Sequence, residues 1–302
     1  MQPALRCSLC RTSFDATQGI ALRKDGFDIV RCPSCGLLSR ASMPSAAEVA
    51  AIYDGEYFRD DPLRPNREGY ADYLSDEALH RRNARRRLGT LSKYVGGRGR
   101  RLLDVGCAAG FFVGEARRQG WQAEGIDLAR EMVEWGRVHT TPELSPLPFA
   151  GFSGPPAEYD VVTMWDYIEH SVDPFSDVER AGALLAPGGL LALSTGDVES
   201  LVARVTGKRW HLLTPAHHNY FFGRTTLAKL LDQRGFEVLL ATSEASWYST
   251  AHLLYKLETL LPLGIGRAFS HRLRRSRIGR LEIPVNLYDI VTIVARKRAD
   301  AA

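Results

Sequence analysis

The stretch Arg101–Gly110, RLLDVGCAAG, decides the fold. Its apolar residues, among them the β-branched Val105, predict a buried strand, and Gly106 and Gly110 predict a tight loop after it. The next stretch, Phe111–Gly120, begins apolar, becomes polar and closes on a glycine suited to a helix C-cap. A strand, a glycine-containing loop and a helix form the first unit of a nucleotide-type α/β fold, in which amides at the helix N-terminus face the ligand.

The loop sequence excludes two common classes of ligand site. A dinucleotide site requires a third glycine in the pattern G-x-G-x-x-G, and a P-loop requires a lysine followed by serine or threonine; both features are missing. Asp104, at the end of the predicted strand, would repel a pyrophosphate and favours a cationic ligand.

The pattern D-x-G-x-x-x-G resembles motif I of the class I S-adenosylmethionine (SAM)-dependent methyltransferases, with Ala108 where many members carry a second glycine. A second predicted strand, Trp121–Asp127, ends in the acid that holds both ribose hydroxyls in that family. The resemblance implies a Rossmann-like seven-stranded sheet with SAM as cofactor, and Tyr70 enters because tyrosines of the preceding segment cover SAM in related enzymes. The residues expected at the cofactor are Asp104, Gly106, Cys107, Gly110, Asp127, Leu128, Trp165 and Tyr70.

The composition is that of an ordinary soluble protein, with 302 residues, 45% of them hydrophobic and 25% charged. The net charge of +4 is too small to indicate nucleic-acid binding alone. Two arginine clusters, Arg81–Arg87 and Arg272–Arg280, are either solvated helix faces or surfaces that attract phosphate on a lipid or an anionic substrate. With no apolar segment of signal-peptide or membrane-spanning length, we expect a cytoplasmic protein with reduced cysteines.

Four cysteines near the N-terminus form two C-x-x-C pairs, Cys7 with Cys10 and Cys32 with Cys35. Their spacing places four thiolates where a tetrahedral zinc ion needs them, and the sequence between the pairs predicts a β-hairpin. Since the protein supplies all four ligands, this zinc is expected to stabilise the fold rather than to activate water.

The chain is predicted to divide into a zinc ribbon (1–42), a helical connector that covers the cofactor (43–98) and a methyltransferase domain (99–302). Within the last, residues 244–288 form an insertion before the final strand, which we expect to be antiparallel. No third strand can be located in the proline-rich stretch that follows the second helix. The other expected strands are Tyr159–Trp165, Leu190–Thr195, Phe236–Thr242 and Asp289–Ala295; the helices between them are 130–138, 174–185 and one capped by Thr225.

The insertion combines an apolar, aromatic stretch with the second arginine cluster. It is too short in apolar residues to span a bilayer. A substrate-pocket lid or a buried helix is favoured over shallow membrane contact through 247–280.

Acidic and histidine side chains follow two neighbouring strands of the predicted sheet. The sequence DYIEH, Asp166–His170, comes directly after the fourth strand; as a helix start it would place Asp166, Glu169 and His170 on one face. The loop after the fifth strand holds three more histidines. Parallel topology brings both segments to one edge of the sheet. The histidines of that loop are His211, His217 and His218.

These segments resemble two branches of the methyltransferase superfamily. Small-RNA 3′-terminal methyltransferases bind Mg²⁺ through E-x-x-E-H and a later histidine, and Asp166, Glu169, His170 and His218 match those positions, with Asp replacing the first Glu. Bacterial glycan, lipid and quinone methyltransferases carry an E-H pair and an H-x-x-x-F loop, and some have an N-terminal cysteine-knuckle domain. The second branch covers more of the chain and is favoured.

The expected reaction is an SN2 transfer of the SAM methyl group to an oxygen or carbon of a small glycan, sugar-nucleotide or lipid-linked acceptor. His218 or His217 would be the base, oriented by His170 or Glu169. Alternatively, Asp166, Glu169, His170 and His218 would bind Mg²⁺ or another divalent ion that acidifies a hydroxyl. A metal-dependent RNA 2′-O-methyltransferase and a SAM-binding scaffold without activity are the alternatives; a structural role of Glu169 and His170 is also open. The oligomeric state is not predicted.

Overall fold

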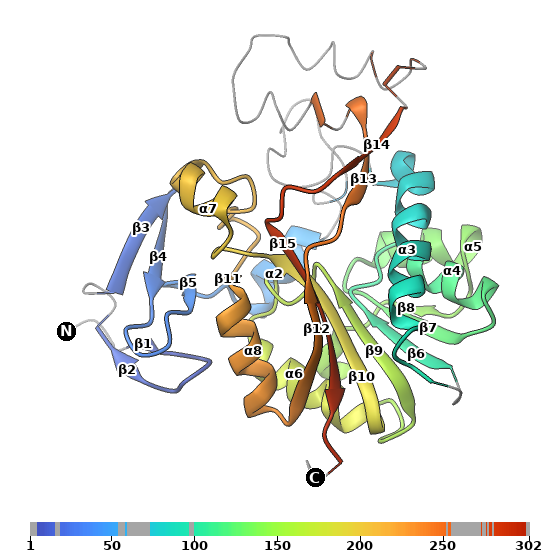
Figure 1. Cartoon of the computed structure of the whole chain (residues 1–302), viewed down its shortest axis with the longest axis horizontal. Helices are drawn as coiled ribbons and strands as arrows, with labels where there is room; N and C mark the ends of the chain where they lie inside the picture. The colour runs from blue at the N-terminus through green and yellow to red at the C-terminus, as the bar shows by residue number, and fades with distance from the viewer. Residues whose placement is uncertain are drawn as a thin grey trace.

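A seven-stranded mixed sheet in the order β12-β15-β10-β9-β6-β7-β8 forms the centre of the molecule (Figure 1). The computed structural model describes residues 5–15, 19–53, 58, 73–96, 100–251, 253–254, 273, 276, 278–279 and 281–299. β15 is antiparallel to both of its neighbours, as predicted for the last strand, whereas the pairs among β6 to β10 are parallel. The strands are β6 (Arg101–Val105), β7 (Gln122–Ile126), β8 (Leu144–Ser145), β9 (Tyr159–Trp165), β10 (Leu185–Gly196), β12 (Phe236–Thr242) and β15 (Ile290–Lys297).

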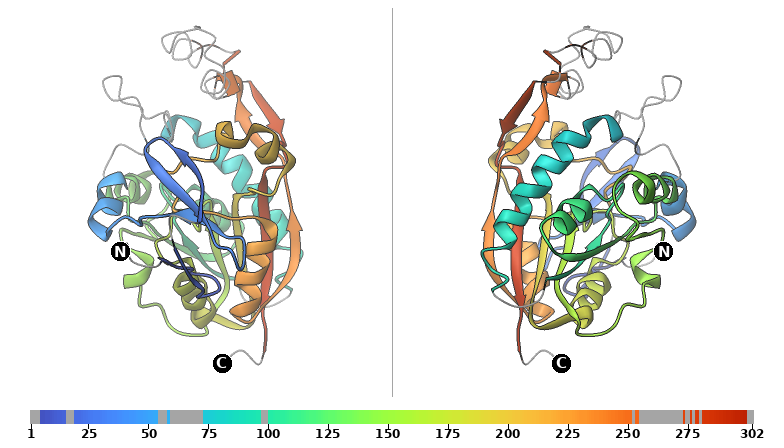
Figure 2. Two further views of the ribbon diagram at one scale, coloured as in Figure 1. Left: turned by 90° about the vertical axis from the view of Figure 1, so that its left-hand side faces the viewer. Right: turned by 90° about the vertical axis from the view of Figure 1, so that its right-hand side faces the viewer.

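Helices cover both faces of this sheet (Figures 1 and 2). Successive strand residues point to opposite faces: Leu102 packs in the cluster with α3 and α4, and Leu103 in the one with α6 and α8. Burial on both faces explains why the strands read as continuous apolar runs. One face carries α3 (Glu77–Leu91), α4 (Phe111–Arg118) and α5 (Arg130–His139), and the other carries α6 (Pro174–Leu184) and α8 (Arg224–Gln233).

The four cysteines lie in turns beside two small N-terminal sheets. One of these sheets also contains a strand from a later part of the chain. The hairpin of β3 and β4 turns through Asp25 and Gly26, whose positive φ values of 51° and 84° suit a two-residue hairpin turn. In the four-stranded sheet β11-β5-β4-β3, however, β11 comes from the loop after β10. These strands are β1 (Leu5–Arg6), β2 (Ser13–Phe14), β3 (Ile20–Lys24), β4 (Phe27–Arg31), β5 (Leu38–Arg40) and β11 (Tyr220–Phe221).

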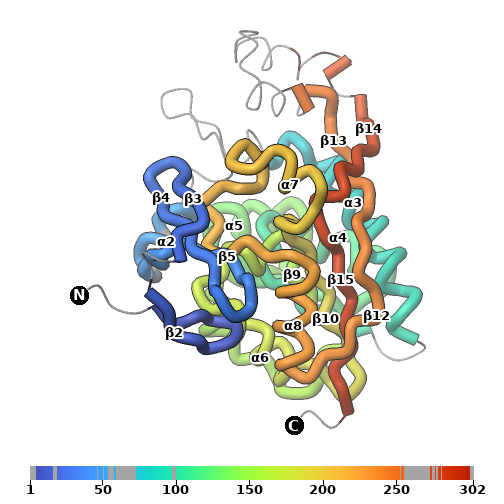
Figure 3. The backbone as a smooth tube through the Cα atoms, turned by 60° about the vertical axis from the view of Figure 1, so that its left-hand side comes forward, coloured from blue at the N-terminus to red at the C-terminus, as the bar shows by residue number. Residues whose placement is uncertain are grey.

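The described part of the insertion is a short hairpin beside α3 (Figures 1 and 3). Its strands, β13 (Ser246–Ser249) and β14 (Glu282–Val285), pair antiparallel. Most of 247–280, including nearly all of the second arginine cluster, lies outside the described residues. The remaining elements are α2 (Ala46–Tyr53), η1 (Leu74–Asp76), η2 (Phe149–Gly151), α7 (Leu201–Thr206) and η3 (Gly207–Arg209).

Two local expectations were wrong, and one strand of the expected seven could not be located in the sequence. Residues 166–170 form a turn rather than a helix start, because Asp166 takes a left-handed conformation with φ 52° as the chain leaves β9. The cap of α8 is Gly223 rather than Thr225. The third strand exists as β8, whose two residues carry too little periodicity to be recognised in the sequence. Among the described residues, the structure shows no helix that is long and apolar enough to cross a membrane.

Two glycine substitutions should change stability in opposite directions. Gly110 has φ +70°, and a Cβ there would lie 2.5 Å from Cδ1 of Leu144. We expect Gly110→Ala to lower the free energy of unfolding by about 2 kcal/mol. Gly89→Ala, inside α3 with nothing within 4 Å of the added Cβ, should raise it by about 0.5–1 kcal/mol. Urea denaturation of both variants measures the two shifts, and equal stabilities would contradict this reading of the loop.

Candidate functional site

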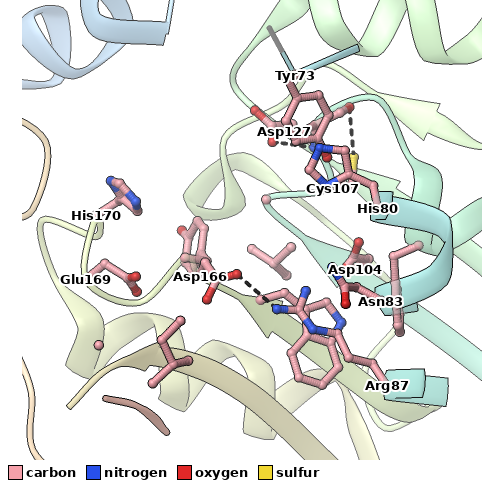
Figure 4. Close-up of a pocket in the computed structure, with 18 of the residues that line it drawn as sticks. Tyr73, His80, Asn83, Arg87, Asp104, Cys107, Asp127, Asp166, Glu169 and His170 are labelled. Carbon is pink, nitrogen blue, oxygen red and sulfur yellow. Dashed lines mark hydrogen bonds and ion pairs between the residues drawn. The ribbon is translucent and has the colours of Figure 1, made fainter. Parts of the chain in front are cut away.

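A cavity of about 950 Å³ lies at the carboxyl edge of the parallel strands. The loop 106–108 and Asp127 line one part of it, and residues 165–173 line another. The loop after β10, the segment that carries β13, Tyr53 of α2 and residues 147–150 line further parts. Figure 4 shows that side chains from α3 reach the same space as those from the strand ends.

The glycine loop and Asp127 form one hydrogen-bonded unit. Ala108 has φ 46°, and its amide donates to Oδ2 of Asp127 at 2.7 Å. The amide of Ala129, at the start of α5, donates to Oδ1 at 2.8 Å. Gly106 has φ +78°, and a Cβ there would meet the ring of Tyr167 at 2.9 Å. The glycine therefore allows the loop backbone to pass close to Tyr167, and the carboxylate of Asp127 joins the loop before α4 to the start of α5.

Asp104 is a buried acid at the end of β6. Its Oδ1 accepts a hydrogen bond of 2.6 Å from Oγ1 of Thr163 on β9. Burial raises the pKa of Asp104 to about 7, although the hydrogen bond from Thr163 opposes this. A buried carboxylate with a raised pKa gains from a bound cation, so the donor set suits the positively charged SAM.

The other predicted cofactor residues are placed as follows. Cys107 is buried against Gly125 of β7, where a Cβ would lie 2.7 Å from that of Cys107, in keeping with a small residue beside the loop. Leu128 is 41% exposed and lines the cavity. Trp165 also lines the cavity, and its Nε1 has no hydrogen-bond partner among the described residues. Tyr70 lies outside the described residues.

The sequence reasoning missed the side chains of α3. His80, Asn83 and Arg87 line the cavity from successive turns of this helix (Figure 4). Tyr73 stacks on His80 with ring centroids 4.1 Å apart. The guanidinium of Arg87 lies 4.6 Å from the ring centroid of Trp165. The three- and four-residue spacing of the polar side chains was the available signal, but the surrounding arginines obscured it.

The arginine cluster of α3 pairs with carboxylates of this chain. Arg81 and Arg85 bind Glu115, each at 3.2 Å, and Arg86 binds Glu244 at 2.7 Å. Such pairing weakens the reading of this cluster as a phosphate-attracting surface. The other pairs in the described part of the chain are Arg81 with Glu77, Arg82 with Glu282 and Arg87 with Asp166.

Glu169, His170 and His218 come together at the cavity wall, with one ligand atom from each within 4.8 Å of the others. Nδ1 of His170 lies 3.0 Å from the carbonyl of His217, and Nδ1 of His218 lies 3.0 Å from that of Leu212. A carbonyl only accepts, so each Nδ1 carries the proton and each Nε2 carries the lone pair. Two such nitrogens and a carboxylate are a ligand set for a divalent ion, and this tautomer is the one that metal-binding histidines adopt when a backbone carbonyl orients them.

The electrostatics of this cluster follow from its burial. Desolvation raises the pKa of Glu169 to about 8 and lowers that of His170 to about 4. Oε2 of Glu169 is buried without a hydrogen-bond partner in the described structure. A cation beside these groups would favour the ionised carboxylate and the neutral imidazole, and thus fits the residues present.

Two predicted members lie apart from this cluster. Asp166 turns away, and its carboxylate binds Nη2 of Arg87 at 3.0 Å and Oγ of Ser194 at 2.8 Å. His217 contributes its carbonyl to His170, while burial lowers the pKa of its own ring to about 4.

The four N-terminal cysteines form the second cluster, with their sulfur atoms within 4.8 Å of one another. Arg11 and Gly36, with φ 63° and 79°, close the two knuckles by donating their amides to the carbonyls of Cys7 and Cys32. The arrangement is consistent with a zinc ribbon.

Comparison with known proteins agrees with this site. A family model described as "Methyltransferase domain" matches residues 75–241, more than half of the 302-residue chain. The chain belongs to this family. It is a SAM-dependent methyltransferase, and SAM is its methyl donor.

Its relatives include ubiquinone biosynthesis O-methyltransferases. The protein from Vibrio cholerae is 32% identical over 171 residues, which cover 53% of this chain and 70% of the relative. The one from Bordetella bronchiseptica is 32% identical over 164 residues, 50% of this chain and 68% of the relative. A solved 1,6-didemethyltoxoflavin-N1-methyltransferase from Burkholderia thailandensis has a TM-score of 0.52 at 17% identity, with 93% of this chain and 99% of that chain covered. This last likeness concerns the fold alone.

The affinity for SAM should depend on pH through Asp104. Because its pKa is about 7 and a cation favours the ionised form, SAM binding must displace a proton below pH 7. We expect affinity to rise roughly tenfold between pH 5.5 and pH 7 and then to level off. Isothermal titration calorimetry should show this dependence in the wild type and in the surface control Asp232→Asn. Asp104→Asn should bind SAM more weakly with a flat profile, and a sloping profile in that variant would assign the dependence to another group.

Proposed function

We propose that this methyltransferase methylates a hydroxyl oxygen of a small glycan, sugar-nucleotide or lipid-linked acceptor, and that Glu169, His170 and His218 bind a divalent cation there. The convergence of their three ligand atoms on the wall of the SAM cavity carries the proposal. The relatives support oxygen over carbon as the acceptor atom, since their names describe O-methyltransferases.

Each residue of the cluster has a defined part. Nε2 of His170 and of His218 would ligate the cation, while the carbonyls of His217 and Leu212 hold the two rings in the required tautomer. Glu169 would supply the negative charge. When bound, a divalent cation lowers the pKa of an acceptor hydroxyl, and SAM supplies the electrophilic methyl group.

The alternatives lose support. Of the two expected metal-free bases, His217 would start from a pKa of about 4, which makes it a poor proton acceptor near neutral pH. The other, His218, belongs to the proposed cation cluster. An RNA acceptor would gain little from arginines of α3 that already pair with carboxylates. A scaffold without activity loses support because the chain belongs to a methyltransferase family.

We further propose that Cys7, Cys10, Cys32 and Cys35 bind a structural zinc ion within the ribbon of residues 1–42. Their four sulfur atoms offer the charge and the softness that zinc favours, and the cluster leaves no ligand position for water.

Methyl transfer from isotopically labelled SAM into fractionated extract of the source cells tests the first proposal. We expect label in the small-molecule, glycan or lipid fraction, loss of labelling with EDTA, and recovery with Mg²⁺ or Mn²⁺ alone. Glu169→Gln should lower the rate at least about 100-fold while SAM affinity stays within twofold. Glu179→Gln, on the surface of α6, is the matched control. Labelled RNA, or full activity with EDTA, would overturn the proposal.

The zinc proposal has its own measurement. Mass spectrometry of the purified protein should find one zinc per chain in the wild type and in Cys107→Ser. Cys10→Ser should lose that zinc and unfold at lower temperature, because metal-binding energy contributes to folding. A Cys10→Ser protein that retains full zinc would refute the assignment of these ligands.

A further inference from the structure

A second polar group lines the cavity: the pair of His211 and Asp289, which the cation cluster does not use. Asp289 directly precedes β15, and its carbonyl accepts the amide of Asp197, just beyond β10, at 2.7 Å. The pair thus lies where β10 and β15 meet, at the same sheet edge as the SAM loop. Asp289 is only 2% exposed, whereas the side chain of His211 keeps 20% of its surface accessible.

The hydrogen bonds of Asp289 determine where the proton of His211 lies. Oδ2 of Asp289 is 2.7 Å from Nε2 of His211, and Nε1 of Trp210 donates to the same oxygen at 2.9 Å. Burial opposes ionisation of Asp289, but the hydrogen bonds from His211 and Trp210 hold its pKa below the usual value. A carboxylate only accepts, so neutral His211 carries its proton on Nε2 and its lone pair on Nδ1. This tautomer is the opposite of that in His170 and His218.

The position of His211 relates it to the proposed cation site. Its neighbour Leu212 supplies the carbonyl that orients His218, so one loop carries both His211 and a member of the cluster. Both line the same cavity. The cavity that would hold an acceptor at the cluster is therefore also lined by a histidine whose Nδ1 carries a lone pair and whose Nε2 is held by a carboxylate.

We propose that His211 is the general base of the reaction and that Asp289 is its positioning residue. Nδ1 of His211 takes the proton of the acceptor hydroxyl. The oxygen then forms a bond to the methyl carbon while the carbon–sulfur bond of SAM breaks, and its electron pair stays on sulfur. The imidazolium, stabilised by Asp289, later releases the proton to solvent. This inference rests on the proposed function, because it requires an acceptor hydroxyl.

Kinetics test the base directly, with labelled SAM and the acceptor-containing extract fraction as probes. At saturating SAM, we expect His211→Ala to lower the initial rate 10²- to 10⁴-fold, with KM for SAM within twofold of the wild type. Added imidazole should raise the initial rate of this variant at least about tenfold. Asp289→Asn should lower the rate with KM for SAM unchanged, and the exposed control His139→Ala should keep the wild-type rate. A His211→Ala protein with the wild-type rate, or one that imidazole does not restore, would overturn the proposal.

The tautomer is measurable without any acceptor. NMR of ¹⁵N-histidine-labelled protein at neutral pH should show His211 with its proton on Nε2, and Asp289→Asn should change this signal. A proton on Nδ1 of His211 would overturn the inference whatever the acceptor is. If the wild type shows the expected tautomer but transfers no methyl group, the result counts against the proposed function. Failure of the base assignment and failure of the proposed function are therefore distinguishable.

Discussion

Asn219 makes the hydrogen bonds that hold the part of the cavity wall formed by Glu169 and His170. Its amide donates to the carbonyl of Glu169 at 2.8 Å, and its side chain donates to that of His170 at the same distance. Its own carbonyl accepts the amide of Arg40 from the end of β5. One residue therefore joins the cysteine-bearing sheet, the turn after β9 and the loop that carries His218. The N-terminal module is thereby built into the wall of the site rather than attached beside it.

The arginines of α3 show how a basic sequence can serve internal structure. Arg82 lies 3.3 Å from the ring centroid of Trp247 and binds Glu282, while Arg86 binds Glu244, so α3 holds both ends of the described insertion hairpin. Exposed ion pairs contribute about 0–1 kcal/mol each. These ion pairs therefore act mainly by alignment: they position α3 against the β13–β14 hairpin, and both elements line the cavity.

The sequence was sufficient for the fold because the fold depends on local patterns. Buried runs such as Tyr159–Trp165 and the D-x-G-x-x-x-G loop identify strands and their edge without knowledge of distant contacts. What could not be predicted depends on contacts far along the chain. The pairing of β11 with β5 involves two residues per strand, and the left-handed turn at Asp166 is set by Ser194 and Arg87. For the same reason the sequence could group His170, His211 and His218, which line the cavity, but could not predict their hydrogen-bond partners.

The hydrogen-bond partners of the rings distinguish histidines that the sequence alone cannot tell apart. His218 and His211 lie on one loop, yet a backbone carbonyl accepts a hydrogen bond from Nδ1 of the first and a buried carboxylate accepts one from Nε2 of the second. A carbonyl orients a ring without adding full charge, so its histidine remains a neutral ligand. A carboxylate also stabilises the imidazolium that forms when a histidine accepts a proton. The two proposed roles, cation ligand and base, thus follow from the chemical nature of one oxygen atom behind each ring.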